Sequence, residues 1–99
     1  MSVAFGNFEN SLKAASGDDA KLFAELRQAF VDSANRQLDL MTRSRCDANW
    51  HHSALRLHGI AASFGAISVM ELADEASQGA PGDPVILRKL NAAITEILS

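Results

Sequence analysis

The chain contains little cysteine and no excess of basic residues, and both shortages narrow what the protein can be. Cys46 is the one cysteine among 99 residues, so no disulfide can form within the chain. A lone thiol fits a reducing compartment, where disulfides rarely persist. Nine Lys and Arg residues stand against twelve Asp and Glu residues, and the net charge is −3. Because nucleic-acid binding needs Lys and Arg to neutralise phosphates, we expect no nucleic-acid partner.

Long hydrophobic runs are also missing. No segment approaches the ~20 consecutive apolar residues of a membrane-spanning helix, and the opening residues, MSVAFGNFEN, lack the charged start and apolar stretch of a secretory signal. We therefore expect no membrane partner and a cytoplasmic location. Hydrophobic residues still make up 47% of the chain, which is enough for a core. The length predicts a single domain over residues 1–99.

Proline is scarce, and apolar residues recur with a helical period. Pro81 and Pro84 lie in the same loop, and β-branched residues do not alternate as they do in strands. We predict an all-α fold, an antiparallel (up-and-down) four-helix bundle with a short extra N-terminal helix. The first expected helix runs from about Phe5 to Ala15, and the second runs from a cap at Asp18 or Asp19 to a polar break at 43–47. The third begins at Asp47 or Ala48 and ends at about Phe64, and the fourth runs from Ile67 to Ser77. The last begins at Pro84, is capped by Asp83, and continues to the C-terminus.

Two of these helices carry clear apolar stripes that we predict to be buried. The stripe of the second helix consists of Leu22, Phe23, Leu26, Phe30, Ala34, Leu38 and Met41. The stripe of the third helix consists of Trp50, Ala54, Leu57, Ala61 and Phe64, with Ile60 at its margin. We expect Met1, Val3, Phe5 and Phe8 to cover one end of the bundle.

The opposite face of the third predicted helix is unusual for a solvated surface. It places Leu55 beside the small residues Gly59 and Ala62, where Lys, Glu or Gln would be usual. Gly59 costs about 1 kcal/mol relative to alanine in a helix interior, which a close approach by another chain segment would offset. Either another helix of the bundle covers this face, or it docks a partner helix. The expected partner-binding residues are His51, His52, Leu55, Arg56, His58, Gly59, Ala62 and Ala66.

The segment from Ala54 to Ala66, ALRLHGIAASFGA, resembles the signature of histidine-containing phosphotransfer (HPt) domains, approximately A-H-x-L-K-G-x-x-x-x-[apolar]-G-A. Residues 12–40 look like the opening helix, Gly-Asp turn and long helix of that family, and residues 65–75 are similar to its continuation after the signature. Members of the family accept a phosphoryl group on an exposed histidine from a receiver-domain aspartate and pass it to another. The resemblance implies a role in two-component or phosphorelay signalling, with a receiver domain or a histidine kinase as partner.

In the register of this resemblance, Leu55 stands where the family has its phosphorylatable histidine, and His58 stands where a basic residue is usual. Leucine has no lone pair that could attack an aspartyl phosphate. We therefore predict a degenerate HPt protein that binds and modulates its partner without carrying phosphate. Such a protein would not be an enzyme, would need no cofactor or metal, and is expected to be a monomer or a weak dimer.

Other interpretations of the same stretch remain open. An active phosphotransferase could use His58, although Ala62 then takes the place of the open glycine. A metal site at His51 and His58 has no carboxylate or cysteine at ligand spacing. A hydrolase built on Ser53 or Ser63 has no strand-to-helix elbow to support it. Finally, the chain could be a non-signalling helical interaction or dimerisation module that shares only the bundle.

Overall fold

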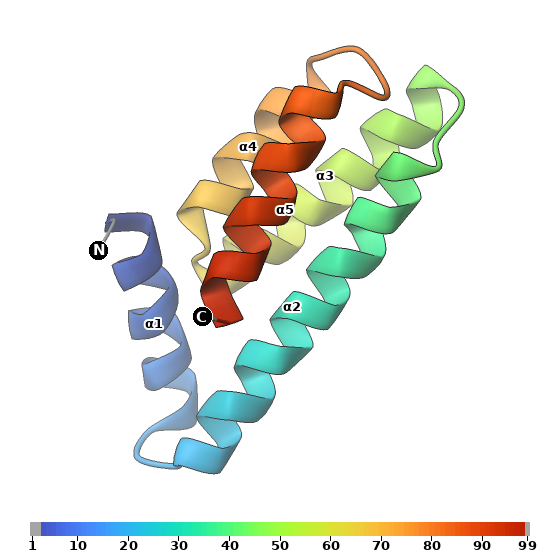
Figure 1. Ribbon diagram of the computed structural model, residues 1–99. Coiled ribbons are helices and arrows are strands. Elements are labelled where there is room, and N and C mark those ends of the chain that lie inside the picture. The colour runs from blue at the N-terminus through green and yellow to red at the C-terminus, as the bar shows by residue number, and fades with distance from the viewer. Residues whose placement is uncertain (1–2, 99) are drawn as a thin grey trace.

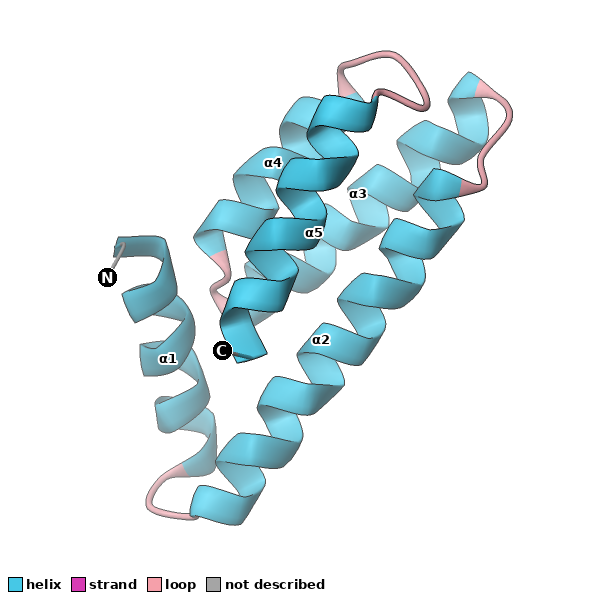
Figure 2. Ribbon diagram, viewed as in Figure 1, coloured by secondary structure: helices cyan, strands magenta, loops and turns pink. Residues whose placement is uncertain are grey.

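A computed structural model describes residues 3–98 of the chain, with side chains from Phe8 onward. These residues form five helices and no strand (Figure 1; Figure 2). The helices are α1 (Val3–Ser16), α2 (Ala20–Thr42), α3 (Asp47–Phe64), α4 (Ile67–Ser77) and α5 (Pro84–Leu98). The predicted all-α class is confirmed, and the third and fourth helices have the predicted bounds.

Helices α2 to α5 pack side by side around a common core. Helix α3 contacts α2 and α4, and α5 contacts the same two helices from the other side. The α2–α3 and α4–α5 loops lie at one end of the molecule, whereas the α3–α4 turn points the other way (Figure 1). Helix α1 packs mainly against α2 and α4. The result is an elongated molecule of 44 × 22 × 19 Å.

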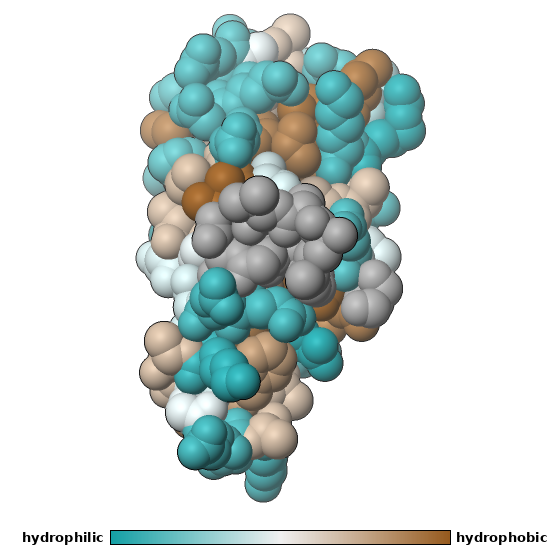
Figure 3. Space-filling model, turned by 90° about the vertical axis from the view of Figure 1, so that its left-hand side faces the viewer, coloured by the Kyte–Doolittle hydropathy of each residue, from teal (hydrophilic) through white to brown (hydrophobic). Residues whose placement is uncertain are grey.

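The core is built from the predicted stripes of α2 and α3, together with one face each of α4 and α5. Its largest fully buried side chains include Trp50, Phe30, Leu57, Leu90 and Ile94. On the side of the molecule where α1 lies, polar residues cover most of the described surface, and apolar residues form only small patches (Figure 3). Apolar area is therefore concentrated inside, where its removal from water stabilises the fold.

Aromatic contacts attach α1 to the rest of the molecule. The ring of Phe8 lies 5.1 Å from that of Phe30, which in turn lies 5.2 Å from that of Phe64. Phe8 is only 1% exposed, so its predicted role in covering one end of the core is confirmed. Met1 and the side chains of Val3 and Phe5, which were expected to share that role, lie outside the described residues.

The predicted stripe of α2 is too long at its N-terminal end. Leu22 is 36% exposed, and Phe23 and Leu26 are only partly buried. This part of α2 extends past α3 and α5 and has α1 as its neighbour (Figure 1). Helical periodicity continues there, but too few neighbouring helices are present to bury the whole stripe. Phe64 of the α3 stripe is likewise only partly buried.

The helix ends follow from local hydrogen bonding. Asp19, rather than Asp18, caps α2, because its carboxylate accepts from the backbone N–H of Leu22 at 3.0 Å. Asp83 caps α5 in the same way and accepts from the N–H of Val85 at 2.9 Å. Gly65 ends α3 with a φ of 72°, a left-handed conformation that glycine adopts without strain.

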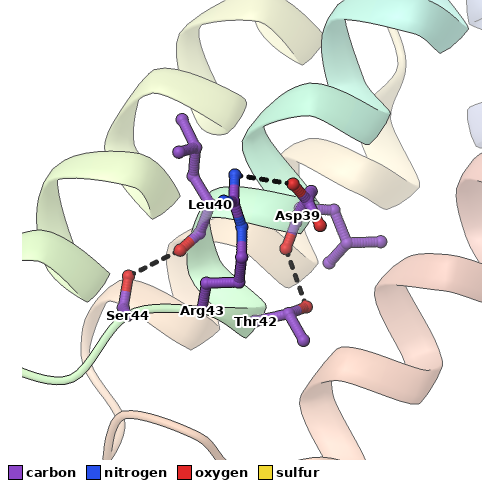
Figure 4. A network of polar contacts seen from close by, with 6 residues as sticks. Asp39, Leu40, Thr42, Arg43 and Ser44 are labelled. Carbon is purple, nitrogen blue, oxygen red and sulfur yellow. Dashed lines mark hydrogen bonds and ion pairs between the residues drawn. The ribbon is translucent and has the colours of Figure 1, made fainter.

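The C-terminal end of α2 is closed by its own side chains (Figure 4). The hydroxyls of Thr42 and Ser44 donate to the backbone carbonyls four residues earlier, at 2.8 and 2.7 Å. Arg43 pairs with Asp39 at 2.8 Å. These contacts satisfy terminal carbonyls of the helix and hold the short turn that leads into α3.

Candidate partner-binding face

The outward face of α3 is uncovered. Leu55 is 47% exposed, whereas Ala54 and Leu57, its neighbours along the chain, are completely buried. Gly59 and Ala62, about one and two turns further on, are exposed as well. The alternative in which another helix of the bundle covers this face is therefore wrong for the part of the chain that the structure describes.

Gly59 has no role in packing among the residues that the structure describes. A Cβ atom added at this position would meet no heavy atom within 4 Å, so the space beyond it is open. Its backbone is helical and does not have the positive φ of Gly65, so its conformation does not require glycine either. The destabilisation that glycine causes in a helix interior is thus not offset by any contact inside the described fold.

Gly59→Ala is expected to raise the free energy of unfolding by about 1 kcal/mol, because alanine is the better helix former and fits without a clash. Urea denaturation followed by circular dichroism measures the change. The matched control is Gly65→Ala, which forces alanine into a left-handed conformation and should destabilise the protein by about 1–2 kcal/mol. A loss of stability in Gly59→Ala would show that the glycine serves the fold.

A groove runs between α2 and α3, next to Leu55. Helix α2 contributes Arg36, Gln37 and Leu40 to its walls, and α3 contributes Arg56, Gly59, Ile60 and Ser63. Gly59 thus belongs both to this groove and to the face around Leu55. Of these residues, the sequence indicated only Arg56 and Gly59 as partner-binding, and it placed Ile60 at the margin of the buried stripe. A signal for the α2 side was present, because Gln37 is a polar residue beside the buried positions Ala34, Leu38 and Met41.

Gln37 is the unusual member of the groove. The residue is 7% exposed, and its Oε1 atom has no hydrogen-bond partner. A buried acceptor without a donor costs about 1–3 kcal/mol. Ser63 does not supply the donor, because its hydroxyl donates to the Gly59 carbonyl at 3.0 Å.

His51 is engaged by the end of α4. Its Nδ1 lies 3.0 Å from the backbone carbonyl of Ser77, so this nitrogen carries a proton when the hydrogen bond forms. The same residues line a separate hollow beside Asp47, Trp50 and Pro81. The imidazole of His51, which was expected to bind a partner, therefore helps to join α3 to α4.

Ala66 does not belong to the outward face, contrary to the prediction. It is 3% exposed and precedes the first residue of α4. The prediction extended the 100° rotation of α3 beyond Phe64, where the helix ends. The left-handed turn at Gly65 redirects the chain, and the N–H of Ala66 donates to the Ala61 carbonyl at 2.8 Å.

The other predicted residues are divided between the face and its margin. His52 and Arg56 are exposed, and His58 is partly buried. Among the residues that the structure describes, the imidazole of His58 has no hydrogen-bond partner. We use the name α3 face for the exposed residues on this side of the helix, which are His52, Leu55, Arg56, Gly59 and Ala62.

Comparison with protein-family models, curated proteins and solved structures found no match for this chain.

Neither a metal-binding cluster nor a membrane-spanning helix is found among the described residues. Over residues 3–98, no group of three or more His, Cys, Asp or Glu side chains is arranged to hold a metal ion. Within the same residues, no helix combines the length and the apolar character that crossing a bilayer requires. Cys46, at the start of α3, is exposed and free.

Two arginines line the groove beside the α3 face. The two salt bridges found among the described residues join Lys21 to Glu25 and Arg43 to Asp39. Arg36 and Arg56 are exposed on the two walls of the groove and take part in neither. The groove lining therefore contains two cationic side chains and no acidic one, on a chain whose net charge is −3.

Proposed function

We propose that this chain is an HPt-like signalling protein that lacks the phosphoryl acceptor. It binds a receiver domain or a histidine kinase through the α3 face and modulates that partner by occupying it. The observation that carries the proposal is the placement of Leu55. In the register of the HPt resemblance this residue stands at the histidine position, and its side chain is 47% exposed on an uncovered helix face. In this proposal α2 to α5 form an antiparallel four-helix bundle, and the protein acts in the cytoplasm as a monomer or a weak dimer.

The side chains of the α3 face support binding without chemistry. The alkyl side chain of Leu55 cannot form a bond to phosphorus, but burying it against a partner would contribute about 1.5–3 kcal/mol. The open space beyond Gly59 lets a partner approach the helix backbone closely. The partly buried His58 is less accessible than Leu55 to an incoming aspartyl phosphate.

Leu55→Asp and Gly59→Arg are each expected to weaken binding of the partner at least tenfold, because one buries a charge and the other fills the open space beyond Gly59. The measurement is isothermal titration calorimetry with a panel of purified receiver domains and histidine kinases. Val85→Asp is the matched control, since Val85 is 46% exposed on α5, away from the face.

Two results would contradict the proposal. If both face variants bind every partner as tightly as the natural chain does, the α3 face is not the docking surface. If no receiver domain or kinase binds the natural chain, the non-signalling interaction or dimerisation module becomes the better interpretation.

A further inference from the structure

We propose that the groove between α2 and α3 binds an acidic amphipathic helix of the partner protein. This inference deepens the proposed function and rests on it for the location of the partner beside the α3 face. It assigns a chemical character to the bound element. The bound helix presents carboxylates to Arg36 and Arg56, and it presents apolar side chains to Leu40 and Ile60 of the groove.

The charge of the groove selects an acidic segment. Arg36 lies on the α2 wall and Arg56 on the α3 wall, so a helix between them meets a guanidinium on each side. A guanidinium can donate two parallel hydrogen bonds to one carboxylate. Neither arginine has an acidic partner in the described chain, and Asp39 on α2 is already paired with Arg43 at 2.8 Å. A basic segment would be repelled from the same position.

The shape and polarity of the groove favour a helix with one apolar side. Leu40 is 38% exposed on the α2 wall, and Ile60 is partly buried on the α3 wall. Because these apolar side chains line the same groove as the arginines, an apolar stripe on the bound helix can face Leu40 and Ile60 while its acidic residues reach Arg36 and Arg56. Because Gly59 has no side chain, the backbone of the bound helix can approach the backbone of α3 closely at this position.

Gln37 provides an independent reason to expect a bound group. It lines the groove, is more than nine-tenths buried, and has an Oε1 atom that no donor in the described chain satisfies. The Oε1 atom has almost no exposed surface in the free protein, so the inference includes a rotation of the Gln37 side-chain amide that turns this atom toward a hydroxyl or amide donor on the bound helix. Binding then recovers a hydrogen bond that the free protein leaves unmade.

The test uses a fluorescent helical peptide of about 16 residues, a length at which a helix can persist. The peptide carries leucine and one serine on its apolar side and glutamate on its other sides. A second peptide has lysine in place of every glutamate. Fluorescence anisotropy is expected to show binding of the glutamate peptide only, with an affinity that falls as salt is added.

Arg36→Gln and Arg56→Gln should each weaken binding of the glutamate peptide about tenfold, and Gln37→Leu should weaken it about threefold. Arg88→Gln should leave the affinity unchanged, because Arg88 is exposed on α5 and is not part of the groove. The inference would be overturned if the two peptides bind equally well or if neither peptide binds. It would also be overturned if the Arg56→Gln and Arg88→Gln variants bind the glutamate peptide with equal affinity.

The same variants separate this inference from the proposed function. If receiver or kinase binding is lost in Leu55→Asp but unchanged in Arg36→Gln and Arg56→Gln, the proposed function stands and the groove inference fails. If the glutamate peptide binds through the arginines while no receiver or kinase binds, the groove inference stands and the proposed partner is wrong.

Discussion

Under the proposed function, Leu55→His is expected to give the protein the phosphoryl acceptor that it lacks. The new imidazole would be exposed on the α3 face, with open space beyond Gly59 one turn further on. A ring nitrogen would attack the phosphorus of a receiver aspartyl phosphate, so that a nitrogen–phosphorus bond forms and the aspartate carboxylate leaves. Incubation with receiver domains phosphorylated by acetyl phosphate, followed by detection of acid-labile phosphate, measures the gain.

Three controls determine what the gain means. The natural chain and Leu55→Gln, which is polar but carries no such nucleophile, should both remain unlabelled. Addition of His58→Ala to the Leu55→His variant should leave the label in place. A variant that binds a receiver but takes up no phosphate would show that Leu55 does not occupy the acceptor position. Labelling of the natural chain that disappears in His58→Ala would establish the active phosphotransferase instead.

Trp50→Ala is expected to lower the free energy of unfolding by about 3–5 kcal/mol, the usual range for removing a buried aromatic side chain. Trp50 is 1% exposed, and its indole N–H donates to the Ala76 carbonyl at 2.7 Å. Its loss leaves a cavity between α3 and α4 and removes one of the hydrogen bonds that the Ala76 carbonyl accepts, while the N–H of Gly79 still donates to that carbonyl at 3.1 Å. Because small domains are stable by only about 5–15 kcal/mol, this change removes a large part of the total.

Urea denaturation followed by circular dichroism is the suitable measurement, because Trp50 is the sole tryptophan and fluorescence is lost with it. Trp50→Phe separates the two contributions, since it keeps most of the apolar volume but removes the donor, and should cost about 1–3 kcal/mol. Leu55→Ala is the exposed control and should change stability by less than about 0.5 kcal/mol. Equal effects of Trp50→Ala and Leu55→Ala would contradict the burial of the indole.

The helix bounds could be predicted because the signals that set them are local. The Asp19 and Asp83 carboxylates satisfy amides only two or three residues away, and Gly65 ends α3 through its own backbone conformation. The outward direction of Leu55 follows equally from the rotation of a single helix, since its position relative to Ala54 and Leu57 is determined by 100° per residue.

What the sequence by itself determined is therefore the set of helices and the side of α3 on which Leu55 lies. Only the tertiary structure decided that no helix covers that side, that Leu22 is exposed and Ala66 buried, and that Gln37 lies in a groove with Gly59. The physical reason is the range of the interactions. Caps and periodicity act over a few residues, whereas exposure depends on contacts between helices that are far apart in the chain.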